Sequence, residues 1–180
     1  MSADEDGLIR LFVGLPLPHD GAVKMSQAAR GVAGLQAVAA DDLHITLRYL
    51  GDVERTRLDA VDDALARVRK KPFTVGVAGC GVFEQAEEDI LYARIESVRQ
   101  VTDLCALVTD RLGALDFDFG PRPFVPHITL GRARPASWSP KSLKIIDKSM
   151  RYSWVAEAFM LYESGGAGRY RVRAVYPLRS

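Results

Sequence analysis

The tetrapeptide His-Ile-Thr-Leu occurs twice in this 180-residue chain, at 44–47 and at 127–130, and this repeat restricts the possible folds more than any other feature. Polar and apolar residues alternate in both copies, which is typical of a β-strand with one buried face. Two of the three histidines in the chain open the two copies. The sequence therefore suggests a duplicated unit, with one such strand in each half.

The segments around the two copies predict a mixture of strands and helices. Apolar residues recur at helical spacing over 54–70 and 99–114, and more weakly over 20–33. Apolar, partly β-branched runs predict the strands, which are Ile9–Leu15, 43–51, a hairpin of 73–82 with 90–95, the second motif, and a final pair at Trp154–Tyr162 and Tyr170–Val175. No linker-like stretch divides the chain, so we expect a single α+β domain over residues 1–180.

The composition is that of an ordinary globular protein, with 48% hydrophobic and 26% charged residues. The net charge is only +1, but residues 1–110 carry −6 and residues 111–180 carry +7. A polyanion would therefore prefer the C-terminal part of the chain. Arginines that only keep the exposed faces of strands hydrated would give the same net charge.

The ends and the cysteines indicate a reducing compartment. The N-terminus, MSADEDGLIR, is acidic where a secretory signal is basic, and Pro16 and Pro18 interrupt the apolar run that follows. We therefore expect a cytoplasmic protein. Cys80 and Cys105 form no CxxC pair, so we expect two reduced, buried thiols rather than a disulfide or a zinc ribbon.

Each repeated motif presents a compact polar pair. Side chains at i and i+2 share one face of a strand, so His44 lies beside Thr46 and Arg48, and His127 lies beside Thr129. If the two strands face each other, two imidazoles and two hydroxyls converge on a volume that suits a tetrahedral anion. Histidine has an unperturbed pKa of about 6.5, so one imidazole can act as base and the other as acid on a cyclic phosphodiester. The threonine hydroxyls can stabilise the charge on the phosphate oxygens.

Other uses of these residues fit the sequence less well. A single histidine on a strand is more often structural than catalytic, but two matching motifs, each followed by an arginine within five residues, argue against that interpretation. A catalytic zinc ion is normally bound by three protein ligands, and no HExxH motif is present. A Ser-His-Asp triad lacks its GxSxG turn. We expect no metal and no cofactor.

The sequence resembles the RNA 2′,3′-cyclic phosphodiesterases, or 2′-5′ RNA ligase-like proteins, of the two-histidine (2H) phosphoesterase superfamily. The matching stretches cover nearly the whole chain and are RLFVGLPLP, LHITLRYLG, FVPHITLGRAR and the final pair from LYES to RYRVRAVYPL. The resemblance implies a bilobal α+β fold with two pseudo-symmetric lobes of antiparallel sheet, outer helices and a central cleft. One HxT motif, 44–46 or 127–129, would lie in each intertwined lobe.

The resemblance also implies roles for individual residues. His44 would donate a proton to the leaving 3′ oxygen and His127 would accept one from water, which yields a 2′-phosphomonoester. Thr46 and Thr129 would bind phosphate, and Arg132 matches a basic position that contacts phosphate or substrate. Arg48, Arg122 and Arg134 are weaker candidates for such contacts. Phe12 would either be buried in the core, which we favour, or form an aromatic wall for a base.

The residues leave three functions open. The first is hydrolysis of 2′,3′-cyclic phosphates on RNA ends or nucleotides. The second is a 2′-5′ RNA ligase acting on tRNA halves, which passes through the same transition state. The third is an RNA-end binding module without turnover. The sequence does not identify the natural substrate. We expect a monomer, because two lobes of one chain complete the site, with no membrane and no obligatory protein partner.

Overall fold

The computed structural model of the chain describes residues 7–121, 123–148, 150–165 and 169–180. The strands are β1 (Leu8–Pro16), β2 (Gln36–Ala37), β3 (His44–Glu54), β4 (Phe73–Phe83), β5 (Asp89–Ile95), β6 (His127–Ala133), β7 (Arg151–Ala156), β8 (Ala158–Ser164) and β9 (Tyr170–Pro177). The α-helices are α1 (His19–Arg30), α2 (Leu58–Ala66), α3 (Val98–Gly113) and α4 (Pro140–Asp147), and single 3-10 turns lie at Ala40–Asp42 and Arg55–Arg57. The expected α+β class is confirmed.

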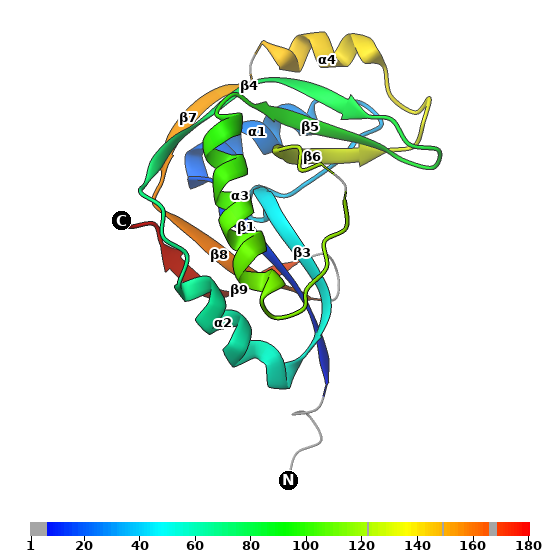
Figure 1. The fold of residues 1–180 in the computed structure, drawn as a ribbon. Helices are drawn as coiled ribbons and strands as arrows, with labels where there is room; N and C mark the ends of the chain where they lie inside the picture. Colours follow the sequence, from blue (N-terminus) through cyan, green and yellow to red (C-terminus); the bar gives the residue numbers. More distant parts are fainter. Residues whose placement is uncertain (1–6, 122, 149, 166–168) are drawn as a thin grey trace.

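The strands form one antiparallel sheet in the order β7-β4-β5-β6-β3-β1-β8-β9, and β2 adds to β6. The two strands that begin with His-Ile-Thr-Leu, β3 and β6, are neighbours in the middle of this order. Figure 1 shows β4, β5, β6 and β7 at one end of the molecule and β1, β3, β8 and β9 at the other. The sheet therefore consists of two halves of four strands, and each half contributes one motif strand to their junction.

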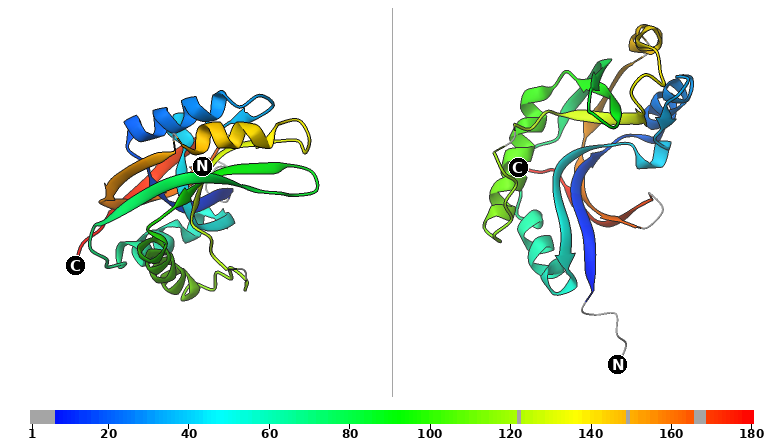
Figure 2. Two further views of the ribbon diagram at one scale, coloured as in Figure 1. Left: turned by 90° about the horizontal axis from the view of Figure 1, so that it is seen from above. Right: turned by 90° about the vertical axis from the view of Figure 1, so that its right-hand side faces the viewer.

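Helices cover the apolar face of each half. Helices α1 and α4 contact β6 and β4, whereas α3 contacts β3 and α2 contacts α3 and β9. Both views of Figure 2 show α1 and α4 near each other and away from α2 and α3. Because α1 follows β1 in the chain but packs on the other half, and α3 follows β5 but packs on the β3 half, the two halves are intertwined. None of the helices in the described part of the chain is long and apolar enough to cross a membrane.

The junction between the halves depends on one residue pair. Strands β3 and β6 pair only at Ile45 and Ile128, and both side chains are fully buried in the core. Alternation then turns the neighbouring polar residues of both motifs to the opposite face of the sheet. The buried isoleucines thus hold the two motifs side by side.

Replacing Ile128 with alanine is expected to destabilise the protein by about 2–5 kcal/mol, because a buried cavity forms at the junction of the halves. Urea unfolding followed by circular dichroism would measure this change. The matched control is Val155→Ala, since Val155 is 54% exposed and its truncation is expected to change the free energy of unfolding by less than about 0.5 kcal/mol. Equal effects of the two substitutions would contradict this view of the junction.

Two features differ from the sequence-based predictions. The single strand expected at Trp154–Tyr162 is two strands, because β7 pairs with β4 in one half and β8 pairs with β1 in the other. The chain crosses between the halves at Glu157. Buried positions shift there from Trp154 and Ala156 to Phe159 and Leu161, so the alternation changes phase. Helix α4 was not predicted.

Candidate active site

The two motifs share the face of the sheet that lies opposite the helices. His44 and Thr46 flank Ile45, and His127 and Thr129 flank Ile128, so the single Ile45–Ile128 pair brings both motifs together. All four polar side chains are half-buried. The two imidazoles are close enough that the charge of His127 affects the pKa of His44. The convergence predicted from the repeated tetrapeptide is therefore present.

Both imidazoles are held in the same way. His44 Nδ1 lies 2.7 Å from the carbonyl oxygen of Asp42, and His127 Nδ1 lies 2.7 Å from that of Val125. A carbonyl oxygen only accepts hydrogen bonds, so each Nδ1 carries a proton and each neutral ring leaves Nε2 unprotonated. His44 Nε2 lies 2.9 Å from Thr46 Oγ1 and accepts from that hydroxyl when the ring is neutral. The Nε2 atoms are therefore the nitrogens available for proton transfer.

The environment of His44 favours its neutral form. Burial lowers its pKa below the usual 6.5, and a positive charge on His127 lowers it further, while the hydrogen bond to the carbonyl of Asp42 and the Asp42 charge act in the opposite direction. An anion bound beside the ring would favour the protonated form. The protonation state of His44 is thus coupled to the occupancy of this face.

Aromatic side chains enclose both histidines. The ring of Phe12 lies 4.7 Å from His44 and stacks at 4.8 Å on Tyr162, and Tyr170 contacts both Phe12 and His44 edge-on. Phe12 is buried, as favoured from the sequence, but it packs against this histidine rather than in the main apolar core. Phe12 thus forms one wall of the site beside His44.

On the other half, Phe83 and Tyr92 stack at 4.1 Å, and both rings contact His127 at 5.0 and 5.6 Å. Gly81 allows this arrangement, because a Cβ there would lie 2.6 Å from the Tyr92 hydroxyl. No sequence pattern predicted Phe83, Tyr92 or Tyr162 as part of the site. The relevant signal is the strand register, in which Tyr162 lies opposite Phe12 and Tyr92 lies opposite Thr129.

A β-bulge decides where Arg132 points. The β5–β6 register shifts after Thr129, so that Thr129 pairs with Tyr92 and Arg132 pairs with Ile90. Without the extra residue, Arg132 would alternate onto the core face. Its side chain is instead 51% exposed on the face of His127 and Thr129, where it donates to Glu88 over 2.9 Å. The expected position of Arg132 beside the site is therefore compatible with the structure.

A second β-bulge turns Arg48 away from the face of His44. Simple alternation along the strand had predicted that the two residues share a face. A register shift in β3 pairs Thr46 with Gly14 but Arg48 with the buried Val13. The Arg48 Nε then donates to Thr109 on α3 over 2.7 Å, and its guanidinium lies over Phe119. Arg48 thus braces a helix and a loop. Arg134 is exposed just beyond β6, and Arg122 lies outside the described residues.

A cavity of about 440 Å³ opens beside His127. Its walls include Thr46, Tyr49, His127 and the loop residues Phe119 and Phe124, but not His44. The volume lies within the range of small-ligand pockets. The two histidines therefore differ in access, because aromatic rings surround His44 while His127 borders an open cavity.

The remaining site expectations concern metals and thiols. Among the residues that the structure describes, no group of three or more His, Cys, Asp and Glu side chains is placed to hold a metal ion. Cys80 and Cys105 are unpaired and buried, as expected. Burial and the neighbouring Asp147 raise the pKa of the Cys80 thiol to about 11.

Comparison with known proteins places these features in a family context. Residues 17–168 match the model of the 2′-5′ RNA ligase superfamily. An RNA 2′,3′-cyclic phosphodiesterase of Thermus thermophilus is 30% identical over 87% of this chain and 82% of its own length. One of Geobacillus stearothermophilus is 28% identical over 93% of this chain, which spans only 56% of that relative. The crystal structure of E. coli LigT complexed with 3′-AMP matches with a TM-score of 0.81 and 26% identity, over 96% of this chain and 99% of LigT.

Proposed function

Because the chain belongs to the 2′-5′ RNA ligase superfamily, we propose that it is an RNA 2′,3′-cyclic phosphodiesterase that hydrolyses cyclic phosphates to 2′-phosphomonoesters. The observation that carries the proposal is the convergence of two His–Thr pairs on one face of the sheet. The names of the relatives support the substrate class. The proposal includes a single domain over residues 1–180, with one motif in each half, acting as a cytoplasmic monomer.

The proposed reaction uses the two Nε2 atoms on opposite sides of phosphorus and requires no metal. His127 Nε2 accepts a proton from water as the water oxygen forms a bond to phosphorus. The bond from phosphorus to the 3′ oxygen breaks, and His44 Nε2 donates its proton to that oxygen. The product carries a 2′-phosphate and a free 3′ hydroxyl, and solvent returns the proton from His127 to His44.

The hydroxyls of Thr46 and Thr129 are proposed to donate to the non-bridging phosphate oxygens. In the free protein Thr46 Oγ1 donates to the neutral His44. When His44 is protonated, its Nε2 no longer accepts, and the Thr46 hydroxyl becomes available for the phosphate. Fixed dipoles of this kind stabilise the charge that develops in the transition state. Arg132, which shares this face, would release Glu88 to contact the same anion or the adjoining nucleotide.

The unequal access to the two histidines supports the direction of proton transfer that the family resemblance implies. The base needs a water molecule, and His127 borders the open cavity. The acid acts on a bound oxygen, and the aromatic rings around His44 limit competition from solvent. This difference favours His127 as base and His44 as acid.

The reaction is tested with an oligoribonucleotide ending in a 2′,3′-cyclic phosphate, incubated with the purified protein in EDTA. Chromatography against 2′- and 3′-phosphate standards identifies the product, and phosphatase treatment confirms a monoester. The proposal requires a 2′-phosphate. A 3′-phosphate product would mean that the bond from phosphorus to the 2′ oxygen breaks, which contradicts the proposal. Activity that appears only after metal is added would overturn the metal-free mechanism.

The pH dependence follows from the lowered pKa of His44. A general acid must be protonated, so kcat/KM falls as the pH rises through the pKa of His44, and we expect the midpoint of this alkaline limb below 6.5. The titratable groups around the ring are Asp42, His127, Tyr162 and Tyr170. Burial raises the pKa of Tyr162 to about 12, so Tyr162 stays neutral across this range.

Removing an aromatic ring that covers His44 tests whether the alkaline limb of the pH profile reports the titration of this histidine. Tyr170→Ala exposes His44 and is expected to move the midpoint toward 6.5, because burial is the largest cause of the shift. Val175→Ala, on the same strand and 51% exposed, serves as the control and leaves the midpoint in place. If the midpoint of the alkaline limb is the same in the Tyr170 variant and the wild type, the limb does not report the titration of His44.

A further inference from the structure

The cavity of about 440 Å³ beside His127 opens where the two central strands separate. Strands β3 and β6 pair only at Ile45 and Ile128, and in antiparallel order the residues after Ile45 face the residues before Ile128. Beyond this pair β3 continues along β1, whereas the described residues before β6 form a loop. We call the gap between them the junction cavity, and its walls are residues 46–49, 118–119, 123–125 and His127.

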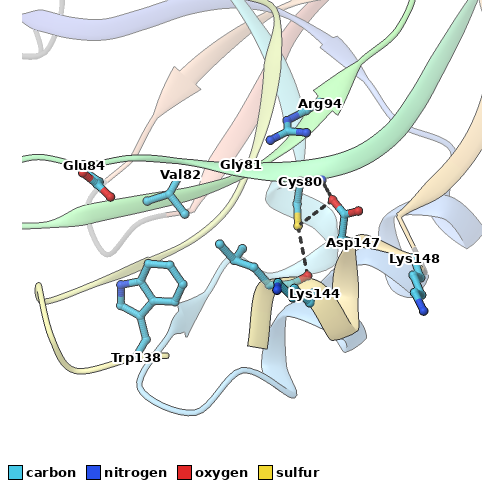
Figure 3. Close-up of a pocket in the computed structure, with 10 residues that line it drawn as sticks. Cys80, Gly81, Val82, Glu84, Arg94, Trp138, Lys144, Asp147 and Lys148 are labelled. Carbon is cyan, nitrogen blue, oxygen red and sulfur yellow. Dashed lines mark hydrogen bonds between the residues drawn. The ribbon is translucent and has the colours of Figure 1, made fainter. Parts of the chain in front are cut away.

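The junction cavity is much larger than the entry of one water molecule requires. A cavity of about 15 Å³ holds one water molecule, so space remains for a part of the substrate. A cavity of about 610 Å³ between α4 and β4 is larger still, but none of the described residues in its wall belongs to either motif (Figure 3). Of these two cavities, only the junction cavity adjoins the proposed reaction centre.

Tyr49 supplies an exposed aromatic ring in the wall of the junction cavity. The β-bulge in β3 pairs Thr46 with Gly14 and Tyr49 with Phe12, and directly paired residues share one face of a sheet. Phe12 contacts His44, so Tyr49 lies on the face of the proposed active site. Because Gly14 and Phe12 are two residues apart, Thr46 and Tyr49 lie about 7 Å apart along the sheet. Tyr49 is 55% exposed, and this exposed ring near the proposed phosphate site suits stacking on a base.

Arg48 holds two further rings of the cavity wall in place. Its guanidinium carbon lies 5.2 Å from the ring centroid of Phe119 and 5.8 Å from that of Phe124, which are attractive cation–π contacts. Arg48 Nε donates to Thr109 on α3 over 2.7 Å, and the Thr109 hydroxyl donates to the carbonyl of Cys105 over 2.6 Å. Arg48 thus ties the loop that carries Phe119 and Phe124 to α3. The aromatic wall therefore exists before any substrate binds.

We infer that the junction cavity binds a nucleobase of the substrate, with Tyr49 as the stacking surface and Arg48 as the positioning residue for the two loop rings. The inference rests on the proposed function. Two bases of an RNA end have this chemistry, namely the base of the nucleotide that carries the cyclic phosphate and the base of the nucleotide before it. The attacking water uses the His127 end of the cavity, and the base uses the Tyr49 end. Stacking tolerates every base, so we expect little preference among the four.

The test uses three 2′,3′-cyclic phosphates that carry no base, one base or two bases, namely those of methyl riboside, adenosine and the dinucleotide ApA. For Tyr49→Ala we expect KM to rise about 5- to 100-fold with kcat unchanged, which is the loss of one stacked base. The rise begins with the adenosine substrate if the terminal base occupies the cavity, and with ApA if the preceding base does. The base-free substrate has nothing to stack, so its KM is expected to be insensitive to this substitution.

Two further variants control for a general effect of substitution. Tyr49→Phe keeps the aromatic ring, so it is expected to recover the affinity that Tyr49→Ala loses. Leu8→Ala removes an apolar side chain that is 64% exposed and lies outside the cavity wall, and it is expected to leave all three KM values in place.

Replacing Arg48 with methionine tests its positioning role. Methionine keeps an apolar stem but lacks the charge over the rings and the donor to Thr109. We expect KM to rise about 2- to 10-fold for the same substrate that responds to Tyr49→Ala, with kcat unchanged. Arg48→Lys retains the charge and is expected to recover part of this loss. A lower kcat for the base-free substrate in Arg48→Met would contradict the positioning role.

Equal KM values for Tyr49→Ala and the wild type on all three substrates overturn the inference, and so does an equal rise on all three. If the wild type hydrolyses none of the substrates, the proposed function fails, and calorimetric titration with the corresponding 2′-phosphates replaces the kinetics. The cavity assignment then stands if Tyr49→Ala binds a base-containing 2′-phosphate at least about fivefold more weakly than the wild type does. It falls if the two proteins bind these compounds equally.

Discussion

Replacing His127 with alanine is expected to lower kcat for a 2′,3′-cyclic RNA end by about 10²–10⁴-fold, and replacing His44 is expected to have an effect of the same order. Each imidazole presents Nε2 for proton transfer because a backbone carbonyl 2.7 Å away holds Nδ1. Removing either ring leaves one proton transfer without its partner. Single-turnover rates at saturating substrate measure the chemical step directly.

The third histidine supplies the control for this prediction. His19 begins α1, its side chain is 80% exposed, and its nearest carboxylate, Asp41, lies 3.8 Å away. His19→Ala is expected to retain the wild-type rate. The double variant lacking His44 and His127 is expected to lose little more than either single variant, because the two groups act as a unit. More than a tenth of the wild-type rate in either single variant would remove that histidine from the mechanism.

Replacing Thr129 or Thr46 with valine is expected to lower kcat/KM by about 10²–10³-fold, the effect of deleting one donor to a developing oxyanion. Valine keeps the shape and the β-branching of threonine, so the strand should be preserved. Thr46→Val also removes the hydrogen bond to His44 Nε2 and is expected to alter the pH profile as well. Steady-state kinetics across pH separate the two effects.

Thr74→Val is the matched control for the threonine pair, since Thr74 is exposed on β4, which β5 separates from β6 in the sheet. Its kinetics should match those of the wild type. If Thr46→Val and Thr129→Val each cost less than about threefold, the hydroxyls do not stabilise the transition state.

The two motif strands were predictable because alternation and repetition are both properties of the sequence. His44 and His127 could be assigned to one site from the repeat alone, and the junction at Ile45 and Ile128 satisfies that expectation. The orientation of the arginines that follow the motifs could not be predicted, because strand register is set by tertiary pairing. One bulge directs Arg132 toward the site and another directs Arg48 toward α3.

The start of helix α4 carries a recognisable sequence signal. Ser139 caps the helix by accepting from the Lys141 N–H, and Pro140 follows it in the first turn, which is a typical helix start. The aromatic walls offered no comparable signal. Phe12 and Tyr162 stack because β1 and β8 are neighbours, and the break at Glu157 that makes them neighbours became clear only from the pairing of β7 and β8.

The most direct test of the central claim, that one histidine acts as acid and the other as base, uses an RNA end in which sulfur replaces the 3′ bridging oxygen of the cyclic phosphate. A thiolate leaves without prior protonation, so the proton from His44 becomes unnecessary. The account predicts that the rate defect caused by His44→Ala shrinks at least tenfold on this substrate, while the defect caused by His127→Ala persists. Equal defects for both variants on both substrates would contradict the assignment.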